Sequence, residues 1–550
     1  MVFSLLYIII LLWFIRTIKF VLFWIYLWQL KNYHVGRFVD HFRTHKGRKI
    51  FFNSLFIVKL VLLVLLFIHY DASFYILLLV YAAESFIFIA NILKRTVKVP
   101  KFTSKTVFLG TMAFLDVTLY LYFLYSYAAN PFWIVILMLA YDILIPVIVS
   151  LIVLFFQPFF VAARNRILQK AAKKMTQFPG LKVIAITGSY GKTSTKEFLT
   201  TILSSKFKVL ATPDHNNSEI GIAQTILRDL KPEHEIFVVE MGAYNKGGIK
   251  LLCDIVEPEM GVVTGVNEQH LATFGSLENL LSAEGGRELL ASLPPHGTII
   301  VNGDNEYCLD LYKTAAIKKR LYAVKKNVLD SHIWTEDVTV NTDSISFIAV
   351  SGQANFIDDP NKSKKEMAHF AASVLGRQQV QNLLGAILAA RELGMNFGEI
   401  SNACGAITQA QAGMTLKKGA YGLEVIDATY SSNSDGVAAD LDYLKIFPGK
   451  CVIVMPCLIE LGNKSSQVHY QIGKKIAEVC DLAIITTKDQ FEQIKKGAIE
   501  NGMAADKVIF SEKPKEIFST ITTSCKQGDT VLIEGGRPKE LIRLLHGKYA

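Results

Sequence analysis

Cysteine is scarce in this sequence and is never paired in a short motif. The 550 residues hold 7 cysteines, the first of which is Cys253, and no two of them form a C-x-x-C pattern. A disulfide framework and a cysteine-based zinc site are therefore not expected. This cysteine usage fits a reducing, cytoplasmic compartment.

Acidic residues are almost missing from the N-terminal part of the chain. Residues 1–170 contain 17 Lys and Arg but only 5 Asp and Glu, whereas the remaining residues contain 41 and 43. The formal net charge of +10 therefore belongs to the flanks of the apolar segments in this region. Because the excess is confined in this way, we expect no nucleic-acid partner.

Long apolar runs occupy the same N-terminal part. A helix needs about 20 apolar residues to cross a bilayer. Residues 1–163 are therefore expected to form an α-helical transmembrane bundle of about five helices. The first run is too long and too poorly terminated for a cleaved signal peptide. The five expected spans are residues 2–30, 50–69, 73–93, 106–128 and 132–157.

Basic and non-basic connections alternate along these spans. The segments 31–49, 94–105 and 164–174 are rich in Lys and Arg, whereas the turns at 70–72 and 128–131 are not. Basic loops stay on the cytoplasmic side. The alternation predicts a multi-pass protein of the cell membrane, with its N-terminus outside and the rest of the chain in the cytoplasm.

Four ionisable residues lie within the expected spans, namely Lys59, Glu84, Asp116 and Asp142, and Arg16 and Lys19 interrupt the first span. Charged groups inside a membrane are costly and often functional. Pairing with one another, or a place near the interface, is the alternative explanation.

A glycine-rich loop follows the membrane part, in the run VIAITGSYGKTSTKEFL at residues 183–199. The pattern predicts a buried strand, a turn and a helix start. Backbone N–H groups of such a loop bind phosphates, the lysine neutralises them, and the Thr hydroxyl binds Mg²⁺. The alternative is an ordinary glycine turn. The predicted nucleotide-binding residues are Gly188, Ser189, Tyr190, Gly191, Lys192, Thr193 and Ser194.

Strands and helices alternate after a basic connector at residues 164–180, and we expect a parallel α/β domain over residues 181–412. Its predicted strands are 182–187, 236–242, 260–266 and 297–303. Ligands bind at the carboxyl ends of parallel strands. Glu240, Asn267 and His270 lie at such ends, and we expect Glu284 in the next helix.

A second α/β domain is expected over residues 413–550. Its predicted strands are 423–429, 451–456, 482–487, 507–510 and 530–535. The pattern is typical of a Rossmann-like unit, but no G-x-G-x-x-G occurs, so NAD is not expected.

Four motifs carry a resemblance to a known family. The loop T-G-x-x-G-K-T, with NNSEIGIAQTIL (216–227), VVEMGA (238–243) and NEQHLATFGSLENL (267–280), resembles the Mur ligases, which are ATP-dependent amide-forming enzymes. The resemblance covers roughly residues 180–540 and implies a P-loop ATPase domain followed by a Rossmann-like domain.

The resemblance also implies roles for single residues. Lys192 and Thr193 would contact the ATP phosphates and Mg²⁺. Glu240 and His270 would be metal ligands and, with Lys192 and Glu284, would form the catalytic set. The substrate loop would include Asn216 and Asn217, and further nucleotide contacts would come from Asn382, Asp427, Tyr430 and Asn433.

Four positions depart from the family pattern. Many Mur ligases have a carbamylated lysine in the helix after the histidine loop. The best-matching position here is Glu284, with a shift to Gly286 as the alternative, and at Glu284 we expect a permanent carboxylate to replace the carbamate. Gln378 and Gln379 replace His and Asn before Asn382, and Met414 replaces a linker arginine.

The predicted reaction is ATP-dependent ligation through an acyl phosphate. The expected substrates are a peptidoglycan precursor, either UDP- or lipid-linked, and an amino acid or dipeptide. The bilayer and other cell-wall synthesis proteins are expected partners. Three alternatives remain: a lipid-precursor amidotransferase subunit, a P-loop-driven transporter and a catalytically degenerate scaffold.

Overall fold

A computed structural model describes residues 2–42, 44–51, 53–94, 96–127, 130–213, 216–267, 270–325, 331–352, 366–430, 433–459, 461–536 and 538–547. The chain forms two compact units, residues 1–165 and residues 166–550.

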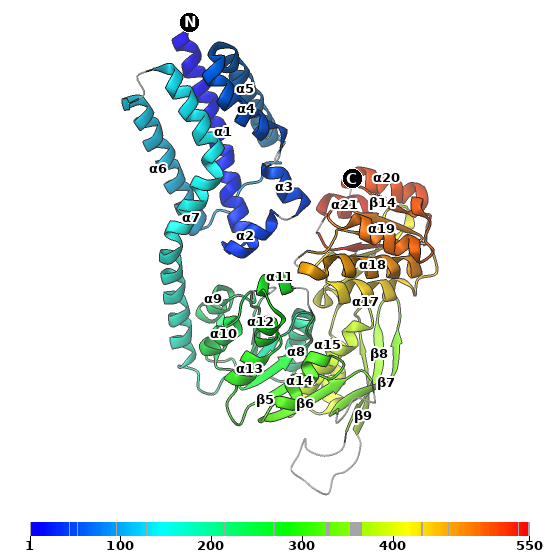
Figure 1. Ribbon diagram of the computed structural model, residues 1–550. Helices are drawn as coiled ribbons and strands as arrows, with labels where there is room; N and C mark the ends of the chain where they lie inside the picture. The colour runs from blue at the N-terminus through cyan, green and yellow to red at the C-terminus, as the bar shows by residue number, and fades with distance from the viewer. Residues whose placement is uncertain are drawn as a thin grey trace. The chain divides into compact units, whose positions relative to one another are not determined.

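Helices are the only regular secondary structure among the described residues of the first unit (Figure 1). Five of its helical stretches are long and apolar enough to cross a membrane: Leu5–Leu30, Gly47–Ile68, Tyr70–Leu93, Ser104–Tyr127 and Pro131–Met175. Its helices are α1 (Val2–Leu30), α2 (Val35–His41), α3 (His45–Phe51), α4 (Ser54–Ile68), α5 (Tyr70–Leu93), α6 (Ser104–Tyr127) and α7 (Pro131–Met175).

Four of the charged side chains inside this bundle pair with one another, which was the alternative to a functional role. Asp116 is not among them; its Oδ2 accepts a hydrogen bond from Tyr141 OH over 2.6 Å. Arg16 forms ion pairs with Glu84, over 2.5 Å, and with Asp142. Lys59 lies 2.5 Å from Glu84 and 3.3 Å from Asp142. All four residues are buried. The cluster contains two cations and two anions, so its formal charges cancel.

The last helix of the bundle continues into the second unit. The basic amphipathic connector that we expected at residues 164–180 is helical over most of its length, because α7 runs without a break to Met175. Its end is amphipathic: Leu168 and Ala171 pack in the core of the second unit, while Lys174 Nζ donates hydrogen bonds to the carbonyls of Leu227 and Leu230. The connector is therefore anchored by packing.

A nine-stranded sheet forms the first half of the second unit, in the order β2-β3-β1-β4-β5-β6-β7-β8-β9. The first six strands and the β6–β7 pair run parallel. The strands are β1 (Lys182–Thr187), β2 (Val209–Ala211), β3 (Ile236–Glu240), β4 (Met260–Val263), β5 (Thr298–Asn302), β6 (Lys318–Ala323), β7 (Ile333–Val340), β8 (Ile345–Ser351) and β9 (Glu366–Ala372).

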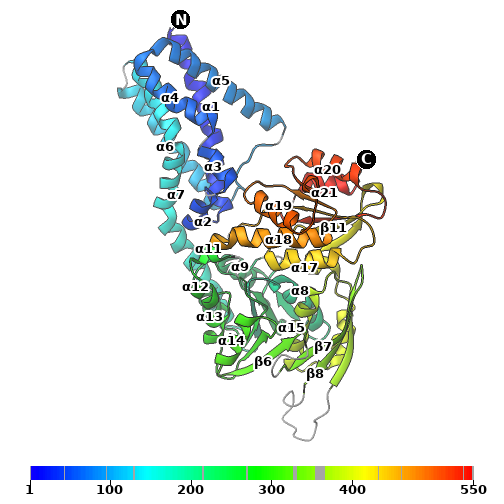
Figure 2. The ribbon, with the colours of Figure 1, turned by 45° about the vertical axis from the view of Figure 1, so that its right-hand side comes forward.

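Helices cover both faces of this sheet (Figures 1 and 2). Side chains of α8, α15 and α16 pack in one apolar cluster, and side chains of α9, α10, α13 and α14 pack in another. The helices are α8 (Lys192–Ser204), α9 (Glu219–Asp229), α10 (Gly248–Val256), α11 (Leu271–Phe274), α12 (Leu277–Ser282), α13 (Arg287–Ser292), α14 (Glu306–Thr314), α15 (Gln378–Glu392) and α16 (Phe397–Cys404).

The far edge of this sheet differs from the expected parallel arrangement. Strands β7, β8 and β9 pair antiparallel. The reason is visible between β7 and β8, where a short turn is closed by a hydrogen bond from Asn341 N to Ser344 O over 2.9 Å. A turn this short can only return the chain antiparallel to itself.

A six-stranded sheet forms the second half, in the order β10-β11-β15-β12-β13-β14. Only β10 runs antiparallel to its neighbour. The strands are β10 (Thr415–Lys418), β11 (Glu424–Ala428), β12 (Cys451–Met455), β13 (Leu482–Ile485), β14 (Val508–Phe510) and β15 (Thr530–Glu534). The helices are α17 (Ser434–Leu444), α18 (Ser465–Val479), α19 (Phe491–Glu500), α20 (Pro514–Ser524) and α21 (Lys539–Leu545).

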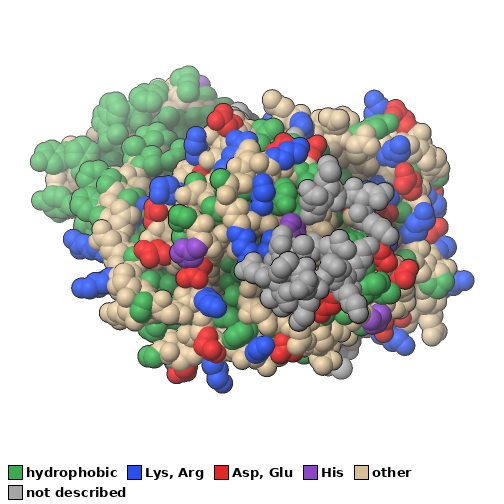
Figure 3. Space-filling model, turned by 90° about the horizontal axis from the view of Figure 1, so that it is seen from below, with side chains coloured by type: hydrophobic (Ala, Val, Ile, Leu, Met, Phe, Trp, Pro, Cys, Tyr) green, Lys and Arg blue, Asp and Glu red, His purple; other side chains and the backbone are tan. Residues whose placement is uncertain are grey.

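The two units differ in surface character. Figure 3 shows apolar side chains gathered over the helical unit, whereas Lys and Arg alternate with Asp and Glu over the α/β unit. Exposed large apolar residues are concentrated in the helices of the first unit, for example Leu79, Phe86 and Phe155. Such a surface suits a hydrocarbon environment.

Candidate active site

The phosphate-binding loop lies between β1 and α8. Gly188 has φ +139 and Gly191 has φ +76, in the region that favours glycine. A Cβ atom at Gly188 would collide with Thr264 Oγ1, and one at Gly191 would collide with Asn382 Oδ1. Both glycines are therefore required by backbone conformation and by space.

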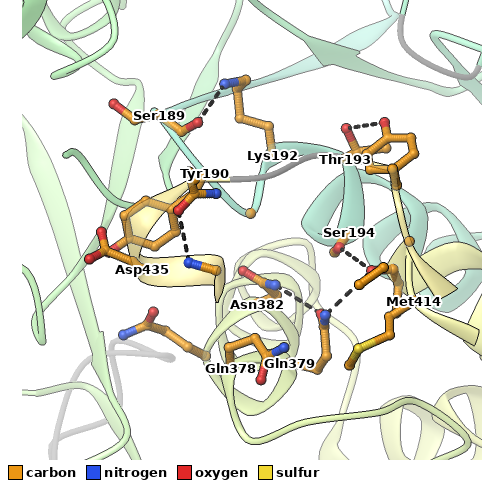
Figure 4. A pocket seen from close by; sticks show the side chains of 18 of the residues that line it. Ser189, Tyr190, Lys192, Thr193, Ser194, Gln378, Gln379, Asn382, Met414 and Asp435 are labelled. Atoms are coloured by element: carbon orange, nitrogen blue, oxygen red, sulfur yellow. Dashed lines mark hydrogen bonds between the residues drawn. The ribbon is translucent and has the colours of Figure 1, made fainter. Parts of the chain in front are cut away.

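The loop lines a cavity of about 470 Å³. Its walls come from the loop after β1, the end of β3, the loop after β4, α15, the segments before β10 and after β11, and α17 (Figure 4). It contains Ser189, Tyr190, Gly191, Lys192, Thr193 and Ser194 from the loop, with Asn217, Glu240, His270, Asn382, Tyr430 and Asn433 among the other predicted site residues.

Glu240 ends β3 and is 2% exposed. Its Oε1 accepts a hydrogen bond from Asn217 Nδ2 over 3.0 Å, and Lys196 Nζ lies 3.7 Å from its Oε2. That Oε2 atom is buried and accepts no hydrogen bond from the described residues. A buried carboxylate oxygen with free acceptor capacity is suited to a hard cation such as Mg²⁺.

The predicted metal ligands are only partly gathered. Thr193, Glu240 and His270 line the same cavity, whereas Glu284 is absent from its wall. Among the described residues, no three His, Cys, Asp or Glu side chains are close enough to form a metal-binding group on their own. Mg²⁺ commonly keeps several water ligands and few protein ligands, so this arrangement fits it.

Glu284 does not lie within a helix, contrary to expectation. It lies in the turn between α12 and α13, because the pair Gly285–Gly286, with φ +85 at Gly286, interrupts the helical pattern. Glu284 is 3% exposed and contacts the phosphate loop. Ser189 Oγ donates to its Oε2 over 2.9 Å, and Lys192 Nζ lies 4.0 Å from its Oε1.

The side chain of Lys192 folds back over the phosphate-binding loop. Its Nζ donates hydrogen bonds to the carbonyl of Gly188 and, over 3.4 Å, to that of Ser189. Its ammonium group therefore lies over the loop backbone, where phosphate oxygens would bind.

The second sheet supplies the opposite wall. Tyr430 OH donates to Thr193 Oγ1 over 3.2 Å, and Asn267 Nδ2 donates to Asn433 Oδ1 over 3.3 Å. Asp427 is not part of the wall; its carboxylate accepts from the hydroxyl of Thr429 over 2.6 Å. Asn216 also lies outside the wall, although Asn217 belongs to it.

Several wall residues were not predicted from the sequence, chiefly Asp435 and Asp440 of α17. Asp440 shares the buried face of its helix with Val437, Leu441 and Leu444. A carboxyl group in an apolar stripe was the available signal. Burial raises the pKa of Asp440 to about 6, against the opposing effect of hydrogen bonds from Glu534 and Gln378. Burial likewise raises the pKa of Tyr190.

Comparison with known proteins identifies this architecture. The family model of the Mur ligase middle domain matches residues 186–390, and that of the Mur ligase, glutamate ligase domain matches residues 414–537. The UDP-N-acetylmuramoyl-tripeptide–D-alanyl-D-alanine ligase of Synechocystis sp. is 30% identical over 366 residues, which cover 64% of this chain and 71% of that protein. The chain belongs to the Mur ligase family.

As a Mur ligase it is an ATP-dependent enzyme that forms a carbon–nitrogen bond. The Escherichia coli enzyme of the same name is 26% identical over 367 residues, which cover 66% of this chain and 76% of that protein. The expected combination of a Mur-type ATPase domain and a Rossmann-like domain is confirmed.

Solved structures show the same fold. MurF from Acinetobacter baumannii superposes with a TM-score of 0.61 and 24% identity, over 69% of this chain and 80% of that chain. MurF from Thermotoga maritima, in complex with ADP, gives 0.59 and 24%, over 69% and 83%. Residues 1–185 lie outside both family models.

Proposed function

We propose that this Mur ligase forms an amide bond on a peptidoglycan precursor at the membrane. The observation that carries the proposal is one cavity lined by Lys192, Thr193, Glu240 and His270, with Tyr430 reaching it from the second sheet. The relatives' names state ligation of D-alanyl-D-alanine to a UDP-N-acetylmuramoyl-tripeptide, and a dipeptide or amino acid is the amine we propose here.

The reaction has two bond-forming steps. A substrate carboxylate attacks the γ-phosphorus of ATP, and ADP leaves with the electrons of the broken P–O bond. The amine then attacks the resulting acyl phosphate, loses a proton and expels phosphate. The protein contributes orientation and charge neutralisation. Lys192 neutralises the transferred phosphoryl group, and the nearby N-terminus of α8 stabilises its negative charge.

We propose that Thr193, Glu240 and His270 hold Mg²⁺ at the phosphates. When bound, the ion neutralises the charge that develops on the phosphate oxygens. The buried Oε2 of Glu240, which accepts no hydrogen bond from the described residues, supports this role. Asn217 orients Glu240 through its hydrogen bond, and with Asn216 it belongs to the proposed substrate loop.

Glu284 has a distinct proposed role. Its permanent negative charge takes the place of a carbamylated lysine, so activity does not depend on CO₂. Its hydrogen bond from Ser189 and its 4.0 Å approach to Lys192 support this assignment, because both partners belong to the phosphate loop.

The remaining nucleotide contacts are assigned to Gly188, Ser189, Tyr190, Gly191, Ser194, Asn382, Asp427, Tyr430 and Asn433. To contact a ribose, the Asp427 carboxylate would have to give up, or share, the hydrogen bond that it accepts from the Thr429 hydroxyl. The proposed domain limits are 1–163 for a transmembrane domain, 164–180 for a linker, 181–412 for the ATPase domain and 413–550 for the C-terminal domain.

The helical unit supports a membrane-embedded enzyme with its catalytic domains in the cytoplasm. Five stretches have the length and composition of membrane spans. Soluble Mur ligases begin with a small domain that grips the UDP of their substrate, and here a helical unit stands in its place. We therefore propose a lipid-linked acceptor, presented at the cytoplasmic leaflet.

The test uses the full chain, purified in detergent, with ATP, Mg²⁺ and D-alanyl-D-alanine or single amino acids. UDP-linked and lipid-linked precursors are supplied separately, and the molecular masses of the products are measured by mass spectrometry. We expect an ATP-dependent product from the lipid-linked acceptor, lost in Lys192→Ala. A product from the UDP-linked form alone overturns the lipid assignment, and no ATP-dependent product from either overturns the proposed reaction.

A further inference from the structure

The helix that follows the phosphate loop carries a second lysine, which the proposed reaction does not use. Lys196 lies about one turn after Lys192 on α8 and is 0% exposed. It is not among the described residues that line the cavity, whereas Lys192 is. Any effect of Lys196 on the reaction must therefore pass through a neighbouring side chain.

That neighbour is Glu240, a proposed metal ligand at the end of β3. Lys196 Nζ lies 3.7 Å from Glu240 Oε2, which is the buried oxygen that accepts no hydrogen bond from the described residues. The other oxygen, Oε1, accepts from Asn217 Nδ2 over 3.0 Å. The carboxylate oxygen with free acceptor capacity is therefore the one beside the ammonium group.

Two further contacts hold the ammonium group in this position. Lys196 Nζ donates to the carbonyl of Thr212 over 2.8 Å, and Thr212 Oγ1 accepts from the backbone N–H of Glu240 over 3.0 Å. Lys196 Nζ also lies 3.0 Å from Oε1 of Glu197, a side chain that is 31% exposed. The described surroundings of this cation therefore contain two carboxylates, of which only Glu240 lines the cavity.

A buried ammonium group beside a metal ligand has two opposing effects on a divalent cation. It holds the carboxylate in place, which favours binding, and it repels the ion, which opposes binding. The energy between two charges scales with their product, and burial weakens the screening by water, so a divalent ion is repelled strongly. Because Asn217 also orients Glu240, we expect the repulsion to be the larger of the two effects.

We propose that Lys196 is a positioning residue that makes occupation of the metal site depend on nucleotide. Without nucleotide, the charge of Lys196 offsets that of Glu240 and weakens the binding of a free divalent ion. The phosphates of a bound nucleotide add negative charge and oxygen ligands at the phosphate loop, so the ion binds together with them. The inference rests on the proposed Mg²⁺ site, and it assigns control of metal binding to a residue outside the cavity wall.

The test measures Mn²⁺ binding to the full-length enzyme in detergent by electron paramagnetic resonance, with and without ADP. Mn²⁺ prefers the same oxygen ligands as Mg²⁺. Lys196→Met keeps an unbranched side chain but removes the charge, and we expect this variant to bind Mn²⁺ without nucleotide roughly 10-fold more tightly than the unchanged enzyme. The gain in affinity that ADP produces should shrink accordingly. Adding Glu240→Gln to this variant should abolish the new binding, which locates it at Glu240.

Glu197→Gln is a second variant with the opposite expectation. It removes the more exposed partner of Lys196, so Mn²⁺ binding without nucleotide should weaken about 2- to 5-fold. Because Glu197 is partly exposed, this variant decides the question if Lys196→Met does not fold. Lys206→Met is the matched control, since Lys206 is 41% exposed at its side chain, pairs with Glu399 over 2.9 Å and lies outside the cavity wall. Its Mn²⁺ binding should equal that of the unchanged enzyme.

The outcomes separate this inference from the proposed function. If the unchanged enzyme neither binds nor consumes nucleotide, or consumes it without any divalent ion, the proposed function or its metal site fails. If the enzyme requires the ion but Lys196→Met, at an unchanged melting temperature, binds free Mn²⁺ no more tightly, the inference is overturned and Lys196 only supports Glu240. Equal Mn²⁺ binding in Glu197→Gln and Lys206→Met also overturns it.

Discussion

The hydroxyl of Tyr430 donates a hydrogen bond to the hydroxyl of Thr193 over 3.2 Å, although 237 positions separate the two residues along the chain. Thr193 is the second residue of α8, the helix after the phosphate loop, and Tyr430 follows the first parallel strand of the second sheet. The contact links a proposed Mg²⁺ ligand to the C-terminal domain. The two halves of the cavity are therefore joined at the residue where the metal would bind.

Tyr430→Phe removes this hydroxyl and keeps the ring. A neutral hydrogen bond contributes about 0.5–1.5 kcal/mol net, so we expect KM for ATP to rise about 3- to 10-fold, with little loss of thermal stability. Steady-state kinetics and a melting curve check this. Tyr470→Phe is the control, because Tyr470 bonds Glu500 at the surface of the same domain; an equal effect there would contradict the assignment.

Substitutions at Glu284 test whether its permanent carboxylate takes the place of a carbamylated lysine. In Glu284→Lys, a lysine occupies the position that we propose to correspond to the family's carbamylated lysine, and its amine can react with CO₂ to restore the negative charge. We expect the variant to be nearly inactive in CO₂-depleted buffer and to recover with bicarbonate. The unchanged enzyme should be indifferent to bicarbonate.

Glu284→Gln completes that experiment. The glutamine keeps the hydrogen bond to Ser189 but lacks the charge, so we expect a higher Mg²⁺ requirement that bicarbonate does not change. Activity across a Mg²⁺ titration, with and without bicarbonate, is the measurement. A Gln variant with the original Mg²⁺ dependence would mean that Glu284 acts only as a structural support for the loop.

Much of the fold follows from the sequence by elementary rules. The first predicted strand, 182–187, matches β1 residue for residue, because the apolar run at residues 183–186 lies directly before a glycine turn. The antiparallel strands β7 to β9 were missed. Each pairs with a strand next to it along the chain, but their buried and exposed residues are mixed, unlike the continuous apolar runs that marked the parallel strands.

The candidate site, like the fold, was predicted only in part. Residues at strand ends, such as Glu240, and in the loop, such as Lys192, were found because parallel strands bring their carboxyl ends together. Asp440 was missed, since its place in the cavity wall depends on contact with Gln378, which lies 62 positions earlier in the chain. The interruption at Gly285–Gly286 placed Glu284 in a turn, which helical periodicity alone does not reveal.

Asp440 also makes stability depend on pH. Its folded-state pKa of about 6 exceeds the value of about 3.9 expected when unfolded, so the folded state binds its proton more tightly. This group therefore lowers stability as pH rises from about 4 to about 6, by up to about 3 kcal/mol.

In Asp440→Asn that contribution is absent, and we expect the variant to gain stability relative to the unchanged enzyme over this pH window. The difference should stay constant above pH 6. Denaturant unfolding of the full chain in detergent at pH 4.5 and pH 7.5 measures it. A difference that does not grow with pH would show that the buried carboxyl group is not the cause.

The buried charges of the helical unit make a separate prediction about assembly. Glu84 Oε2 lies 2.5 Å from both Arg16 Nε and Lys59 Nζ. Glu84→Gln leaves the cluster with excess positive charge in an apolar surrounding, which costs about 3–5 kcal/mol. We expect this variant to be poorly inserted or rapidly degraded, whereas the double variant Lys59→Met/Glu84→Gln, which restores neutrality, should recover most of the folded protein.

Asp71→Asn, at an exposed acidic residue in the first turn of the same helix, is the control. Yield and melting temperature of the purified proteins are the readouts, and equal loss in the single and double variants would mean that Glu84 acts through its shape and hydrogen bonds instead of its charge.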